Sequence, residues 1–171
     1  MFEFEMPGDI NDLKEMEYAL CDYLGFDDLT EKTYREWQTY FGLEESVEMD
    51  AEHEISMFNK CGSTMITDFP EMTSPFWNMS RNDDGKTSKK IDVILGGMET
   101  IGSAERSCDV EQMRDTFHTI TEGAYSKLLF ELFGKDRVEA ELEKFLEFDF
   151  FPRVGGGIGM TRMISALDTI N

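Results

Sequence analysis

The 171-residue sequence is poor in basic residues. It carries 16 Lys and Arg against 36 Asp and Glu, a formal net charge of −20, and no run of Lys or Arg interrupts this acidity. Proteins that bind nucleic acid neutralise its phosphates with clustered basic side chains. The composition therefore argues against tRNA binding by this chain alone, and indicates an acidic, solvated surface.

Cysteine and histidine are also scarce. Cys21, Cys61 and Cys108 are odd in number and form no Cys-x-x-Cys pair, which argues against a disulfide framework and a zinc knuckle. His53 and His118 are too few for a histidine-rich metal site.

Long apolar runs are missing as well. No stretch approaches the roughly 20 residues that span a bilayer, and residues 1–5 lack the basic start and apolar core of a signal peptide. We therefore expect no membrane association and a cytoplasmic location. A hydrophobic content of 40% is enough for a packed core, so one domain over residues 1–171 is predicted.

Hydrophobic periodicity predicts strands and helices that alternate irregularly. One clear hairpin is present, and this favours an α+β fold with a largely antiparallel sheet over a doubly wound parallel one. Residues 81–90 are expected to form a mobile surface loop. Strands are predicted at 1–6, 65–67, 76–79, 91–95, 98–101 and 148–154, and helices at 13–24, 34–41, 54–60, 109–129, 136–146 and 160–171.

The predicted hairpin places two carboxylates together. If Gly96–Gly97 is a two-residue turn, Ile94 faces Glu99 across the ladder. Side chains alternate along a strand, so Asp92 and Glu99 share a face with Ile94. Such a pair suits Mg²⁺ that is also held by substrate phosphates. The alternative is that both carboxylates merely solvate an exposed sheet face.

Arg106 follows seven residues after Glu99, beyond Gly102–Ser103. Its guanidinium can return to the same pocket, where its fork of donors suits a carboxylate. The alternative is an ion pair with a sequence neighbour, Glu105 or Asp109.

A second candidate site is the glycine-rich segment 155–159, predicted to follow a strand and precede a helix. It is not a G-x-G-x-x-G motif, because residue 160 is Met, and it lacks the Gly-Lys-Ser/Thr of a P-loop. Glycines let a flat ligand lie against the backbone, and Arg162 falls in the first helical turn, where the dipole favours anions. The alternative is a tight strand-to-helix crossover without a ligand.

These segments resemble one known family. Residues 155–162, Gly-Gly-Gly-Ile-Gly-Met-Thr-Arg, look like motif 3 of class II aminoacyl-tRNA synthetases. Residues 92–106 resemble the aspartyl and asparaginyl branch of that class, residues 68–77 its preceding strand, and residues 2–5 the second strand of motif 2. The resemblance covers nearly the whole chain in consistent order and implies a partial class II catalytic domain.

The resemblance also implies roles for individual residues, with ATP and Mg²⁺ as cofactors. Glu99 and Arg162 are implied in catalysis. The implied ligands are Asp92 and Glu99 for the metal, Gly157, Gly159 and Arg162 for ATP, and Glu3, Ser103 and Arg106 for the amino acid.

The sequence departs from the family pattern at several points. Thr161 stands where an acidic residue usually precedes the motif 3 arginine, which is similar to ammonia-dependent asparagine synthetase, and Ser74 replaces an arginine of aspartyl enzymes. Motif 1, the motif 2 arginine and an anticodon-binding domain have no counterpart. We expect a homo-oligomer or a partner chain to supply the missing N-terminal part.

The first functional expectation is therefore ATP-dependent activation of aspartate as an aspartyl adenylate, with ammonia as acceptor to give asparagine. One alternative is a fragment of an aspartyl- or asparaginyl-tRNA synthetase. Another is a non-catalytic paralogue that binds an amino acid, a nucleotide or a partner.

Overall fold

The computed structural model of the protein describes residues 1–26 and 28–170. Its strands are β1 (Phe2–Pro7), β2 (Thr30–Thr33), β3 (Thr64–Pro70), β4 (Thr87–Leu95), β5 (Met98–Glu105) and β6 (Arg153–Ile158). Its α-helices are α1 (Ile10–Leu24), α2 (Tyr34–Phe41), α3 (Ala51–Cys61), α4 (Val110–Thr119), α5 (Ala124–Phe133), α6 (Lys135–Leu146) and α7 (Met160–Leu167).

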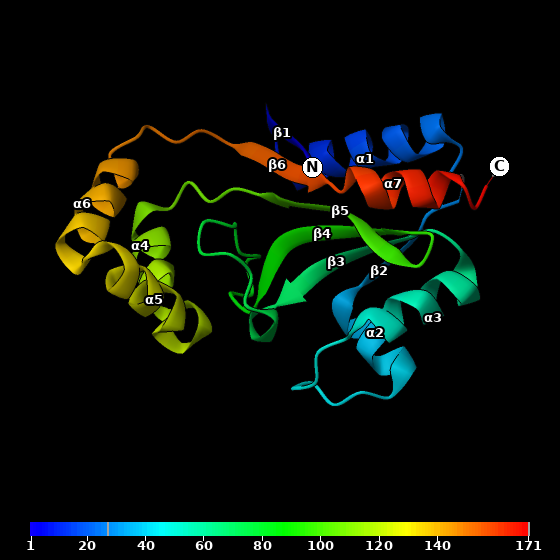
Figure 1. The fold of residues 1–171 in the computed structure, drawn as a ribbon, viewed down its shortest axis with the longest axis horizontal. Helices are drawn as coiled ribbons and strands as arrows, with labels where there is room; N and C mark the ends of the chain where they lie inside the picture. The colour runs from blue at the N-terminus through cyan, green and yellow to red at the C-terminus, as the bar shows by residue number, and fades with distance from the viewer. Residues whose placement is uncertain (27, 171) are drawn as a thin grey trace.

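The six strands form one sheet in the order β1-β6-β5-β4-β3-β2 (Figure 1). Every neighbouring pair is antiparallel except β2 and β3, which run parallel. The predicted α+β fold with a largely antiparallel sheet is confirmed. No helix within residues 1–26 and 28–170 has the length and apolar character needed to cross a membrane.

Helices cover both faces of the sheet. On one face, α1 and α7 lie side by side (Figure 1). Their residues Leu13 and Met163 pack with Val93 of β4. On the opposite face, α2 and α3 contribute Trp37 and Met57 to a cluster with Ile94, the next residue of β4. Successive side chains of a strand point to opposite faces, so β4 contributes to both cores. We call the face under α1 and α7 the helix-covered face, and the other the cleft face.

The helices α4, α5 and α6 form a third cluster at one end of the molecule (Figure 1). Trp77 anchors this cluster to the loops beside the sheet, with its ring 5.5 Å from those of Phe117 and Phe145.

Local sequence signals set several helix ends as predicted. The helices α1 and α2 end at Gly25 and Gly42, whose φ angles of 88° and 68° are left-handed. Asp109 caps α4 and accepts a hydrogen bond from the backbone of Gln112.

Other predicted elements were wrong. Residues 77–78 form a turn rather than an extended run, and the expected loop at 81–90 is shorter because β4 begins at Thr87. The helix predicted over 109–129 is broken into two, since Thr121, Glu122 and Gly123 have φ angles of 51°, 55° and 79°. The parallel strand β2 was not predicted, and α7 ends at Leu167.

The glycine-rich segment also differs from expectation, because Gly155–Gly157 lie inside β6 rather than after it. The aromatic residues 148–152 lead into the strand instead of forming it. A Cβ on Gly155 would lie 2.8 Å from the carbonyl oxygen of Phe4, and one on Gly156 would lie 2.7 Å from that of Gly102. These two glycines therefore make room for the neighbouring strands β1 and β5.

Candidate functional site

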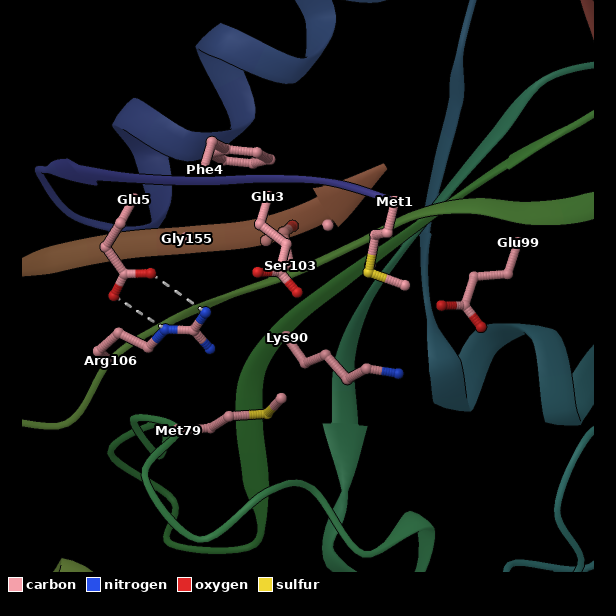
Figure 2. A pocket seen from close by; sticks show the side chains of 13 residues that line it. Met1, Glu3, Phe4, Glu5, Met79, Lys90, Glu99, Ser103, Arg106 and Gly155 are labelled. Carbon is pink, nitrogen blue, oxygen red and sulfur yellow. Dashed lines mark hydrogen bonds and ion pairs between the residues drawn. The ribbon is translucent and has the colours of Figure 1, made fainter. Parts of the chain in front are cut away.

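A cleft of about 490 Å³ opens on the cleft face of the sheet, over β1, β6, β5 and β4 (Figure 2). Side chains alternate in direction along β1, which explains the negative charge on this side of the cleft. Phe4 packs toward α1, while Glu3 and Glu5 point into the cleft (Figure 2). The volume suits a small-molecule ligand. The lining includes five charged residues: Glu3, Glu5, Lys90, Glu99 and Arg106.

The hairpin of β4 and β5 brings Asp92 and Glu99 together. Ile94 pairs with Glu99 as predicted, and an irregularity in register then places Asp92 opposite Gly102. A Cβ on Gly102 would lie 2.7 Å from Glu99 Oε1 and 3.5 Å from Asp92 Oδ1. Both carboxylates thus face the space left by Gly102, and the predicted shared face is confirmed.

Asp92 is buried at the base of this space, with 6% of its surface exposed. Its Oδ2 accepts a hydrogen bond from Lys90 Nζ at 2.5 Å, and its buried Oδ1 has no partner among the described residues. Burial raises the pKa of Asp92 above its usual range, while the Lys90 ammonium opposes that rise and the neighbouring Glu99 adds to it.

The acidic pair fits a divalent cation that is held mainly by a phosphate ligand. A buried carboxylate oxygen without a partner, beside a second carboxylate, is a set of hard oxygen donors suited to Mg²⁺. Within the described part of the chain, no group of three or more His, Cys, Asp or Glu side chains is placed to hold a metal. The protein would thus supply Asp92 and Glu99, and the bound phosphate ligand would supply remaining oxygen ligands of the cation.

Arg106 lies at the opposite end of the cleft. Its Nε and Nη2 donate to Glu5 Oε1 and Oε2 at 3.3 and 3.4 Å (Figure 2). In addition, Arg153 Nε lies 3.6 Å from Glu5 Oε1. The alternative of an ion pair with a sequence neighbour is therefore wrong, since Glu105 pairs with Lys89 instead. Glu5 stands between two arginines.

Ser103 lines the cleft, but its hydroxyl is engaged on the other side of the sheet. Its Oγ donates to Glu17 Oε1 at 2.6 Å, and Glu17 is a fully buried residue of α1. Gly102 faces the cleft, so the next side chain must point away from it. Burial raises the pKa of Glu17 to about 7, and the hydrogen bond from Ser103 opposes the rise.

The predicted nucleotide-binding residues lie close to the acidic pair. Gly157 lines the cleft, and the backbone N–H of Gly159 donates to the carbonyl of Thr100 at 2.9 Å. Arg162 lies in the first turn of α7 and donates from Nη1 to the carbonyl of Glu99 at 2.6 Å. The arginine is exposed and sits beside Glu99 rather than in the lining of the cleft.

Sequence reasoning missed three charged residues of the site, Glu5, Lys90 and Arg153. Glu5 and Lys90 carried a usable signal, since each lies two residues from a predicted site residue, Glu3 or Asp92, and so shares its face. Arg153 gave no such signal, because it was placed in an aromatic strand with no predicted ligand.

A family model described as tRNA synthetases class II (D, K and N) matches residues 11–170. The chain belongs to this family. Among curated members, asparagine–tRNA ligase of Rhodopirellula baltica is 29% identical over 123 residues, 69% of this chain and 25% of that protein. The Mesoplasma florum asparagine–tRNA ligase is 26% identical over 136 residues, 77% of this chain and 26% of that protein.

This class II chain thus spans about a quarter of the length of the curated relatives it matches. The expected synthetase-like core is confirmed. These relatives favour the alternative of a synthetase fragment over the ammonia-dependent asparagine synthetase that we expected first.

Solved structures share the fold of this class II chain. Aspartyl-tRNA synthetase from Entamoeba histolytica has a TM-score of 0.72 at 17% identity, covering 99% of this chain and 40% of that one. Asparaginyl-tRNA synthetase from Pyrococcus horikoshii complexed with asparaginyl-adenylate has a TM-score of 0.74 at 16% identity, covering 96% and 43%. At these identities the likeness shows the fold alone.

Proposed function

We propose that this chain is the adenylate-forming part of an asparaginyl-type class II synthetase. In this reaction a carboxylate oxygen of the amino acid attacks the α-phosphorus of ATP, and the bond to pyrophosphate breaks. The proposal rests on one observation: Glu3, Glu5, Asp92, Glu99 and Arg106 meet around a single cleft of a class II catalytic fold.

The amino end of the substrate suits Glu3. The Glu3 carboxylate points into the cleft (Figure 2), and no ion pair or hydrogen bond joins it to another of the described residues. An α-ammonium group would supply the missing cation. This agrees with the role that the family resemblance implied for Glu3.

The side-chain end suits an amide better than a carboxylate. Arg106 is already held by Glu5, whose two oxygens face it. An amide oxygen can accept from an arginine while the amide nitrogen donates to a glutamate, whereas a second carboxylate would be repelled by the glutamates. We therefore favour asparagine over aspartate as the substrate.

The remaining residues would act by position and charge rather than as nucleophiles. Asp92 and Glu99 would hold Mg²⁺, which when bound screens phosphate charge. Arg162 is anchored beside Glu99 and offers its remaining guanidinium N–H groups to a nucleotide phosphate. Gly157 leaves the adjoining strand surface open to a flat ligand.

The acceptor is part of the same proposal. Relatives that are asparagine–tRNA ligases favour tRNA over ammonia. Because the net charge is −20, we infer that another segment or a partner chain would supply the basic surface for tRNA. Formation of free asparagine from aspartate, ammonia and ATP would instead support the ammonia-dependent ligase.

The direct test is calorimetry with non-hydrolysable asparaginyl- and aspartyl-adenylate analogues. We expect the asparaginyl analogue to bind at least tenfold more tightly, and Glu3→Gln to weaken both. Equal or reversed affinities would refute the choice of asparagine. Amino-acid-dependent ATP–pyrophosphate exchange then separates an active chain from a paralogue that binds without catalysis.

A further inference from the structure

Lys90 is a cation fixed inside an otherwise acidic part of the cleft. It lies two residues before Asp92 on β4 and therefore on the same face. Its Nζ is 2.5 Å from Asp92 Oδ2 and 3.9 Å from the centroid of the Phe69 ring on β3. Figure 2 shows the side chain extending across the cleft in the direction of Glu99. Carboxylate and ring together hold the ammonium in place.

This ammonium lies next to the place where an incoming cation would bind. The carboxylates of Asp92 and Glu99 both face the space beside Gly102, and Glu54 lies close by, where it accepts the backbone N–H of Glu99. Without Lys90, the acidic pair would attract a free divalent ion more strongly. With Lys90 in contact, one Asp92 oxygen is already taken and the ion meets a like charge.

A second lysine on the same strand shows what a purely structural pair looks like. Lys89 points to the helix-covered face and pairs with Glu105 Oε1 at 2.7 Å, while Glu105 Oε2 accepts from the backbone of Ile10. Both oxygens of Glu105 are therefore satisfied. Asp92 differs, because its Oδ1 is buried beside Glu99 with no partner among the described residues.

We propose that Lys90 is a built-in counter-cation of the Asp92–Glu99 pair, which keeps a free divalent ion out until nucleotide phosphates supply the missing ligands. In this scheme the metal enters with the nucleotide, and Asp92 Oδ1 with Glu99 forms the protein share of its coordination. The inference rests on the proposed function only in taking the acidic pair as the metal site.

The experiment uses Mn²⁺ alone, without amino acid or nucleotide, and measures its binding to the full chain by electron paramagnetic resonance. Lys90→Gln should raise the affinity for Mn²⁺ at least tenfold. Lys89→Gln, the matched control on the opposite face, should bind as the wild type does. Adding Asp92→Asn to Lys90→Gln should abolish the gain.

Two outcomes would overturn the proposal. One is a folded Lys90→Gln variant whose affinity for Mn²⁺ equals that of the wild type. The other outcome needs no lysine variant. If the wild type binds Mn²⁺ at micromolar concentration without nucleotide, and Asp92→Asn abolishes this binding, then Lys90 does not exclude the ion. Neither measurement involves adenylate formation. The Mn²⁺ result can therefore be interpreted even if the chain shows no ATP–pyrophosphate exchange.

Discussion

The two faces of the central sheet each bury a carboxylate, and the two acids are held in different ways. Asp92, on the cleft face, is paired with a lysine, lies beside Glu99 and borders an open cavity. Glu17, under α1, receives one hydrogen bond from Ser103 and is fully buried. Burial raises the pKa of both.

The difference shows that burial alone does not mark a functional acid. Each carboxylate leaves one buried oxygen without a partner among the described residues, Asp92 Oδ1 and Glu17 Oε2. Only the oxygen of Asp92 adjoins a second carboxylate and a cavity. The neighbours of the acid, rather than its burial, therefore indicate ligand binding for Asp92 and a structural role for Glu17.

The largest effect should come from the cleft face. Asp92→Asn should lower ATP–pyrophosphate exchange about a hundredfold or more, because it removes a preorganised charge from the proposed metal site. Glu105→Gln removes a similarly paired carboxylate from the helix-covered face and serves as control. If both variants lose the same amount of exchange activity at similar thermal stability, the two faces do not differ in function as proposed.

The next effect concerns the pH dependence of folding at Glu17. Its pKa is about 7 in the folded protein against 4.5 for an ordinary glutamate, so the folded state keeps a proton that the unfolded state releases. Stability should thus fall by about 3 kcal/mol as the pH rises from 4.5 through 7. Glu17→Gln should remove this loss in urea unfolding, with Glu15→Gln on the exposed side of α1 as control. An unchanged slope would contradict the assignment.

A smaller contrast lies within β6. Gly156→Ala should reduce the free energy of unfolding by about 2 kcal/mol, because its Cβ would lie 2.5 Å from Ser103 Cβ and 2.7 Å from a backbone oxygen. Gly157→Ala meets the flexible side chain of Met1 at 2.9 Å and should cost less. Similar losses, measured by chemical denaturation, would mean that β6 is equally constrained on both faces.

The smallest effect should come from the ion pair of Glu5 with Arg106. Half of the Glu5 side chain is exposed, so Glu5→Gln should change the free energy of unfolding by about 0.5 kcal/mol. The same variant should weaken discrimination between the two adenylate analogues, measured by calorimetry. A loss of stability comparable to that of Gly156→Ala would make Glu5 a structural rather than a specificity residue.

Much of the local structure was predictable because its signals are local. Gly25 and Gly42 end helices because glycine readily adopts left-handed φ angles, and Gly96–Gly97 forms the two-residue turn of a hairpin. The errors arose where a neighbour decides the conformation. The glycines 155–157 look like a loop, but they form a strand because β1 and β5 pair with them on both sides, and neighbouring backbone leaves no room for a Cβ at Gly155 and Gly156.

The sequence alone determined which side chains share a face, since alternation along one hairpin already joins Asp92 to Glu99. It also determined the acidity of the chain and the order of its motifs. Only the tertiary structure decided which strands are neighbours. Glu5 meets Arg106 across 101 residues because the sheet order brings β1 and β6 beside β5. Ser103 meets Glu17 across 86 residues because α1 packs against β5. Periodicity fixes the direction of a side chain but not its partner, and the site depends on partners that are distant in the chain.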